Sequence, residues 1–374
     1  MSRSKLALKV FFLAGLLALA GCAPQPQPAP MPTAQATPTP PAAPAVQPKP
    51  KALTVAHHML LLEQELGADQ RDMRLLDALL NRIDREVSFP SAYSWEQAAL
   101  TLSSISMVIN SSYGYSPRRL LSTGLKDQVL DCDLLTAIYL SVAQRHGLPL
   151  KAVVVPRHTF IRWVWPDGRY LDWETTIGQV TSDKNFVSGL YLKSVQGRRL
   201  SKVFTLQPGV VSGAYLRNLD IEQFLALSHL NVASGFLDQL QRSNARQGPG
   251  FQERLAKARQ HLHKAIALDP KRVEAYFGLG IVSYLQGDYE AAIGRLNQAI
   301  ALFPMEPEMF FSRAQIFLAR GQNEQGIGDL KEVHRLDPGH PKVPYLLYNA
   351  YRSQGDQGQA DYWWKRMQQP TRRY

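Results

Sequence analysis

Cysteine is scarce in this chain, whose 374 residues include only Cys22 and Cys132. Two cysteines cannot build the multiple-disulfide framework that holds small secreted domains together. Histidine, cysteine and carboxylate residues do not cluster at metal-ligand spacing, so neither a metal site nor a cofactor is expected. Acidic residues are also few, with 31 Asp and Glu against 42 Lys and Arg, and the formal net charge is +11.

Long apolar runs are missing except near the N-terminus, where residues 6–20 are almost all apolar after a short basic start. The run is shorter than the roughly 20 residues that span a bilayer, and is typical of a cleaved secretory signal. It ends in Leu19-Ala20-Gly21-Cys22, which resembles the bacterial lipobox. The resemblance implies a signal peptide over 1–21 and a lipid anchor on Cys22. Because Ala23 follows, it also implies an outer-membrane location facing the periplasm.

Nucleic-acid motifs are missing despite the basic charge. The sequence has no zinc-finger spacing, no RNP-like motif and no basic helix, and an exported chain rarely meets nucleic acid. We therefore expect no nucleic-acid partner. The positive excess suits anionic envelope polymers or lipid headgroups, or is an ordinary solvated surface.

Residues 22–52 are dominated by Pro, Ala, Gln and Thr and carry almost no charge. Such a segment buries too little apolar surface to offset the entropy of ordering it. We predict a disordered tether between the lipid anchor and the folded part of the chain.

A fixed period marks the C-terminal part of the chain. Pro270, Pro304 and Pro338 lie 34 residues apart, and each follows a similar helical segment. This pattern resembles the tetratricopeptide repeat (TPR). The resemblance implies an all-α solenoid over 221–370 whose concave groove binds a protein or peptide partner. Three glycines are predicted to end the first helices of successive repeats: Gly287, Gly321 and Gly355.

Residues 53–220 are predicted to form a separate α+β domain. Apolar residues at helical spacing predict helices over 57–66, 73–85 and 94–109. His57 and His58 have no other metal-ligating residues at suitable spacing, and both are expected at the surface.

Cys132 lies at the predicted start of another helix, which Asp131 can cap and Gly147 can end. In the first helical turn, the helix dipole favours a thiolate. The flanking carboxylates of Asp131 and Asp133 oppose it, so a thiolate there needs a histidine partner. Because lipidation would consume the Cys22 sulfur, Cys132 is expected to remain a single thiol.

Three strands are predicted after this helix, over 151–155, 159–165 and 169–176, with a turn at 166–168. The order is therefore a cysteine at a helix start, His158 beside a strand, and carboxylates on the next strand. In this order, residues 75–178 resemble the bacterial transglutaminase-like superfamily, which has a papain-type fold. The matching segments are Asp131-Cys132-Asp133, Gly147-Leu148-Pro149, 156–163 and Asp172-Trp173-Glu174-Thr175-Thr176.

The resemblance implies that Cys132 is the nucleophile, His158 the general base, and a carboxylate the group that orients the imidazole. Pairing across the predicted turn puts Thr176 opposite His158. Glu174 then lies about 7 Å along the strand and Asp172 about 13 Å along it. Register favours Glu174, whereas the superfamily's usual aspartate favours Asp172, so both remain candidates with Glu174 slightly preferred.

Two functions of different classes stay open. In the first, Cys132 carries out acyl transfer or peptidase chemistry on a peptide or protein in the envelope, and the repeats dock substrate or partner. In the second, the chain is a non-catalytic scaffold lipoprotein that assembles an envelope complex, with the Cys/His fold as its platform. The sequence leaves undecided whether the protein is an enzyme.

Overall fold

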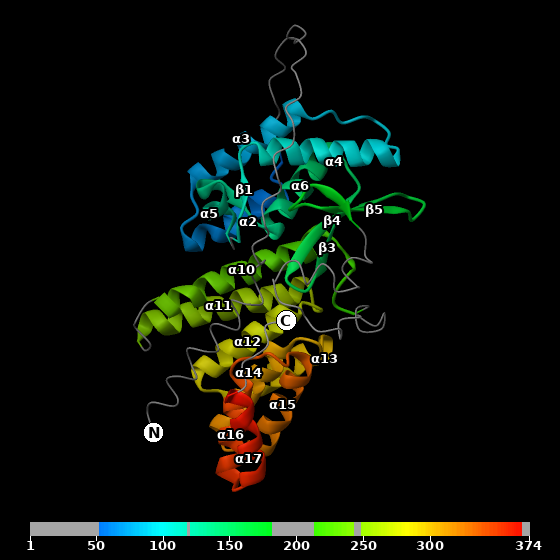
Figure 1. The fold of residues 1–374 in the computed structure, drawn as a ribbon. Helices are drawn as coiled ribbons and strands as arrows, with labels where there is room; N and C mark the ends of the chain where they lie inside the picture. Colours follow the sequence, from blue (N-terminus) through cyan, green and yellow to red (C-terminus); the bar gives the residue numbers. More distant parts are fainter. Residues whose placement is uncertain (1–51, 118–119, 182–212, 243–247, 369–374) are drawn as a thin grey trace.

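The computed structural model describes residues 52–117, 120–181, 213–242 and 248–368. The predicted signal peptide, the lipidation site at Cys22 and nearly all of the predicted tether lie outside these residues. Figure 1 shows the N-terminal helices and the sheet at one end and the helical repeats running away from them. Within the described ranges, no helix is long and apolar enough to cross a membrane.

The N-terminal region is helical where apolar spacing predicted it. The helices are α2 (Val55–Glu63), which continues into the short η1 (Gln64–Leu66), α3 (Gln70–Glu86), α4 (Trp95–Asn110) and α5 (Leu121–Asp127). Asp69 caps α3 and Ser94 caps α4, each through a reciprocal capping box. A small parallel pair, β1 (Gly114–Tyr115) and β2 (Val129–Leu130), leads into α6 (Cys132–His146).

Helix α6 lies at the centre of this region. Its Asp131 cap accepts a hydrogen bond from Leu134 N at 3.1 Å, and Gly147 ends it with φ of 67°, as predicted. Residues 134–143 of α6 are all buried, so the helix is covered around its whole circumference. It therefore fixes the position of Cys132 at its first turn against both the sheet and the surrounding helices.

A five-stranded antiparallel sheet packs against α6, with the order β6-β5-β4-β3-β7. The strands are β3 (Leu150–Val155), β4 (His158–Val164), β5 (Tyr170–Glu174), β6 (Gln179–Thr181) and β7 (Asn218–Leu219). In the β4–β5 ladder Ile161 lies opposite Trp173. This is the predicted register, in which Thr176 would face His158.

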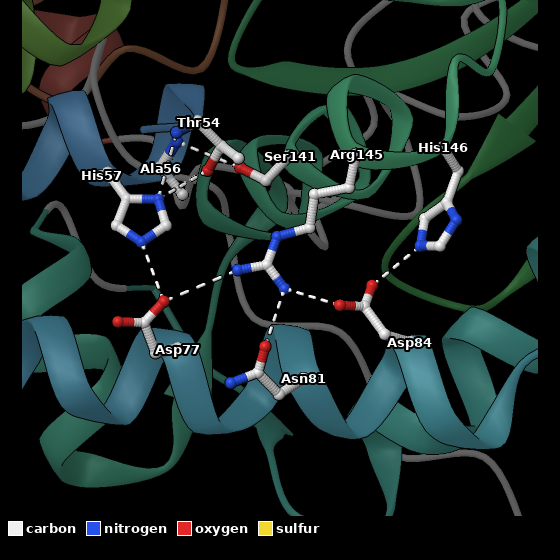
Figure 2. A network of polar contacts seen from close by, with 9 residues as sticks. All are labelled: Thr54, Ala56, His57, Asp77, Asn81, Asp84, Ser141, Arg145 and His146. Atoms are coloured by element: carbon white, nitrogen blue, oxygen red, sulfur yellow. Dashed lines mark hydrogen bonds and ion pairs between the residues drawn. The ribbon is translucent and has the colours of Figure 1, made fainter. Parts of the chain in front are cut away.

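A polar network joins α2, α3 and α6 (Figure 2). His57 Nε2 lies 3.2 Å from Asp77 Oδ1, and Arg145 donates to Asp84 Oδ2 at 2.9 Å. His146 Nε2 lies 2.7 Å from the other oxygen of Asp84. Because these side chains come from three helices, the network fixes how the helices pack around α6.

The prediction that His57 lies at the surface is wrong, since its exposed fraction is 5%. Its Nδ1 accepts a hydrogen bond from the backbone N–H of Thr54 at the start of α2, and the Thr54 hydroxyl lies 2.8 Å from the same nitrogen. The ring therefore completes a helix cap and faces α3. His58 is exposed, as predicted.

The buried Glu63 carboxylate joins α2 to α5, where its two oxygens accept from Leu121 N at 2.7 Å and Ser122 N at 2.8 Å. Burial raises the pKa of Glu63 to about 7 from an ordinary value of 4.5, outweighing the hydrogen bonds that lower it. Folding therefore favours the protonated carboxyl. Its contribution to stability is complete below pH 4.5 and is lost as the pH rises to about 7.

We therefore expect Glu63→Gln to remove a loss of stability that the wild type suffers between pH 5 and pH 7.5. The shift in the pKa of Glu63 limits this loss in unfolding free energy to about 3 kcal/mol. Urea unfolding of both proteins at the two pH values measures the difference. Glu86→Gln, at an exposed pair with Arg82, is the matched control and should leave the pH dependence unchanged. An equal change in unfolding free energy between the two pH values for wild type and Glu63→Gln would contradict the expectation.

The C-terminal half is built of helix pairs. They are α10 (Ile221–Arg242) with α11 (Pro249–Leu268), α12 (Val273–Gln286) with α13 (Tyr289–Leu302), α14 (Pro307–Ala319) with α15 (Asn323–Leu336), and α16 (Val343–Gln354) with α17 (Gln357–Gln368). Gly287, Gly321 and Gly355 adopt positive φ just after the first helix of a pair, as predicted. At Gly280, a Cβ would meet the Leu296 side chain at 3.0 Å, so glycine allows α12 and α13 to approach.

The helical repeats pack directly on the N-terminal domain, as α10 contacts α2 and η1 (Figure 1). Tyr215 donates to Glu274 Oε1 of α12 at 2.9 Å, and Arg217 pairs with the buried Asp269 between α11 and α12. The first repeats are therefore part of the same packed body as the sheet, and the later pairs extend from it.

Candidate functional site

Cys132 is the first residue of α6 and is fully buried. Its Sγ lies 3.7 Å from Asp133 Oδ1. The structure assigns Cys132 to a disulfide, which differs from the expected single thiol. The sequence has one other cysteine, Cys22, which lies outside the described residues. The expectation of a single thiol depended on lipidation of Cys22, because a sulfur held in a thioether cannot form a disulfide whereas a free thiol can.

His158 begins β4, and its Nε2 lies 2.7 Å from Glu174 Oε2 of β5. Both side chains are buried. Glu174 Oε1 accepts from the backbone N–H and the hydroxyl of Thr176, at 3.1 and 2.7 Å. Burial opposes the charged carboxylate, but the His158 charge and these hydrogen bonds hold the pKa of Glu174 below its ordinary value. The carboxylate is therefore held in its charged form against one ring nitrogen of the histidine.

Asp172 lies on the same face of β5 but has a different partner. Arg162, directly opposite it on β4, donates from Nε to Oδ1 at 2.6 Å and from Nη2 to Oδ2 at 3.0 Å. The guanidinium also lies over the Tyr170 ring, 4.2 Å from its centroid. The structure thus brings Glu174, and not Asp172, to His158. A glutamate can reach the diagonal cross-strand neighbour, whereas Asp172 faces arginine directly.

Asp133 belongs to the site although the sequence suggested only that it would oppose a thiolate. Its Oδ1 accepts from Thr159 Oγ1 at 3.0 Å, and Thr136 Oγ1 lies 3.3 Å from that hydroxyl. Burial raises the pKa of Asp133, while the Thr159 hydrogen bond and the charges of His158 and Arg272 lower it. No local sequence signal could have linked Asp133 to Asn231 of α10, which lines the same small cavity, because the two residues come from separate parts of the fold.

The surroundings of the His158–Glu174 pair are rich in charge. Burial, together with the nearby carboxylates of Asp131, Glu174 and Asp133, raises the pKa of Tyr115. A small cavity of about 30 Å³ lies beside His158, and Asp133, Arg157, Asn231 and Glu274 contribute to its lining. In the described residues there is no cluster of three or more side chains that could bind a metal ion.

Comparison with known proteins supports the repeats. A family model described as tetratricopeptide repeat matches residues 252–316. This part of the chain consists of TPR repeats. Two crystal structures of MamA are similar to the chain, each at 20% identity. The first match covers 38% of this chain and 70% of the MamA chain, with a TM-score of 0.33. The second covers 40% of this chain and 93% of the MamA chain, with a TM-score of 0.30. No curated protein matches the chain. The TPR match covers α11 to α13 and part of α14, next to the cavity beside His158.

Proposed function

We propose that the reduced protein carries out thiol acyl chemistry on a peptide or protein, with the TPR array docking the substrate or a partner protein. The observation that carries the proposal is the hydrogen bond between His158 and the charged Glu174 carboxylate, in the same α6-and-sheet unit as Cys132. A carboxylate–imidazole pair beside a cysteine at a helix start is the arrangement that activates a thiol. This is the chemistry that the transglutaminase-like resemblance implies.

The proposed reaction begins with proton transfer from Cys132 to His158. Because Glu174 bonds Nε2, the Cys132 proton would pass to Nδ1 of His158, and Glu174 would stabilise the imidazolium. The thiolate then attacks an amide carbonyl, and the backbone N–H of Cys132 is the candidate donor to the oxyanion. The C–N bond breaks as the imidazolium returns its proton to the leaving amine. Water or a second amine then attacks the thioester carbonyl, the C–S bond breaks, and the acyl group leaves as an acid or an amide while the Cys132 thiol is regenerated.

Lipidation and thiol chemistry are linked in this proposal. Attachment of a diacylglyceryl group to Cys22 would leave its sulfur as a thioether and so prevent a disulfide with Cys132. We therefore propose the lipid-anchored form, in the outer membrane facing the periplasm, as the form with a reactive thiol. An unmodified Cys22 would instead permit oxidation of Cys132 and block the chemistry.

The test is alkylation of Cys132 by iodoacetamide at graded pH, in the full chain carrying Cys22→Ser and kept reduced. Half-maximal reactivity is expected well below pH 8, because the imidazole stabilises the thiolate. The same chain in denaturant should react like an ordinary thiol, with a midpoint near about 8.5. Mass spectrometry locates the adduct, and Cys132→Ala is the blank. A native midpoint near that of the denatured chain would rule out an activated cysteine.

A second function has its own support. The complete burial of Cys132 and its assignment to a disulfide favour a non-catalytic scaffold, in which the Cys/His fold is a platform and the TPR array recruits envelope partners. The alkylation experiment separates the two functions. A thiol that remains inert in the reduced chain is the scaffold outcome.

A further inference from the structure

The tip of the β3–β4 hairpin reaches the TPR array. Arg157, in the turn directly before His158, adopts a φ of 62°, which is unfavourable for a residue with a Cβ. Its Nη2 lies 3.1 Å from Oε1 of Glu306, which precedes α14 and lies 149 positions later in the sequence. A strained turn persists only where its surroundings hold it, and this ion pair is one such contact.

A shared cavity also places the array beside the same hairpin. Asn231 of α10 is buried and lines the cavity beside His158 together with Asp133, whose Oδ1 accepts from Thr159, the residue after His158. Glu274 of α12 lines the cavity beside His158. Helices α10 and α12 therefore contribute to the cavity beside His158, and the start of α14 contacts the residue before it.

We propose that the TPR array positions the His158 hairpin, with Arg157 and Glu306 as positioning residues, so that the array sets the reactivity of Cys132. This inference rests on the proposed function for its consequence at the thiol. In this inference the TPR array is a structural part of the His158 site as well as a docking surface. A protein bound across the start of α14 would then alter the site through Glu306 without touching Cys132.

The test is a charge swap in the full reduced Cys22→Ser chain. Arg157→Glu and Glu306→Arg should each lower the alkylation rate of Cys132 at pH 6 about fivefold and shift the pH midpoint upward. The double variant recreates an ion pair with reversed charges and should restore both. Arg169→Glu, in an exposed pair with Asp167 at the opposite end of β4, is the matched control and should change neither.

Amide hydrogen exchange over residues 153–160 provides a readout that does not depend on the thiol. Faster exchange in both single variants, with recovery in the double, supports positioning by the array. If the parent thiol is inert while exchange follows this pattern, the proposed function fails and positioning stands. If the parent thiol is activated but the single variants match it in rate and exchange, the inference is overturned. The inference is also overturned if the single variants lower the alkylation rate and the double variant does not restore it.

Discussion

Replacing His158 with glutamine is expected to lower the rate at which iodoacetamide alkylates reduced Cys132 at pH 6 by roughly 10²-fold. An ordinary thiol with a pKa near 8.5 is about 0.3% ionised at that pH, whereas a thiol paired with imidazolium is largely ionised. The variant keeps a side chain that can bond Glu174, so the packing of β4 on β5 should change little. The measurement is the pH–rate profile in the chain carrying Cys22→Ser.

A matched imidazole makes this prediction specific. His146 also places Nε2 2.7 Å from a carboxylate, Asp84, but at the opposite end of α6 from Cys132. His146→Gln should leave the profile unchanged. Glu174→Gln removes the charge that stabilises the imidazolium and should slow alkylation by about tenfold. Equal rates for His158→Gln and the parent would remove His158 from the proposed chemistry.

Replacing Asp172 with alanine is expected to destabilise the fold by about 3–5 kcal/mol. The substitution removes the carboxylate that accepts two hydrogen bonds from Arg162, whose guanidinium is buried in the sheet. A buried cation that loses its carboxylate keeps the desolvation cost without the compensating attraction. Urea unfolding followed by circular dichroism measures the change in unfolding free energy.

Two further variants separate the charge from the packing. Asp172→Leu combined with Arg162→Met removes both charges and should recover most of the lost stability. Asp167→Ala breaks the exposed pair with Arg169 on the next turn and should cost less than about 1 kcal/mol. A loss below about 1 kcal/mol for Asp172→Ala would show that the buried pair is not structural. In that case Asp172 would again be a candidate partner for His158.

These two experiments also address the choice between Glu174 and Asp172. Both residues lie on one face of β5, and the sequence left either open. Strand period and turn position were sufficient to predict the register, which is local and set by the Pro166-Asp167-Gly168 turn. The partner of each carboxylate depended on its cross-strand neighbour. Arg162 lies directly opposite Asp172, leaving Glu174 for His158.

The sequence by itself determined the repeating helices and the start of α6, because both depend on short-range patterns. The 34-residue spacing of Pro270, Pro304 and Pro338 predicted the TPR repeats, and Asp131 and Gly147 predicted the two ends of α6. The hairpin around His158 was likewise predictable from β-branched runs and a turn. Each signal arises from neighbours in the chain, so no tertiary contact is needed to recognise it.

Only the tertiary structure decided which distant groups meet at the site. Arg157 meets Glu306 across 149 residues, and Asn231 of α10 lines the same cavity as Asp133 at the start of α6. His57 is buried for the same reason, since α3 covers a ring that helical spacing alone left at the surface. Such contacts depend on how whole elements pack, and packing is set by the summed burial of many side chains rather than by any local motif.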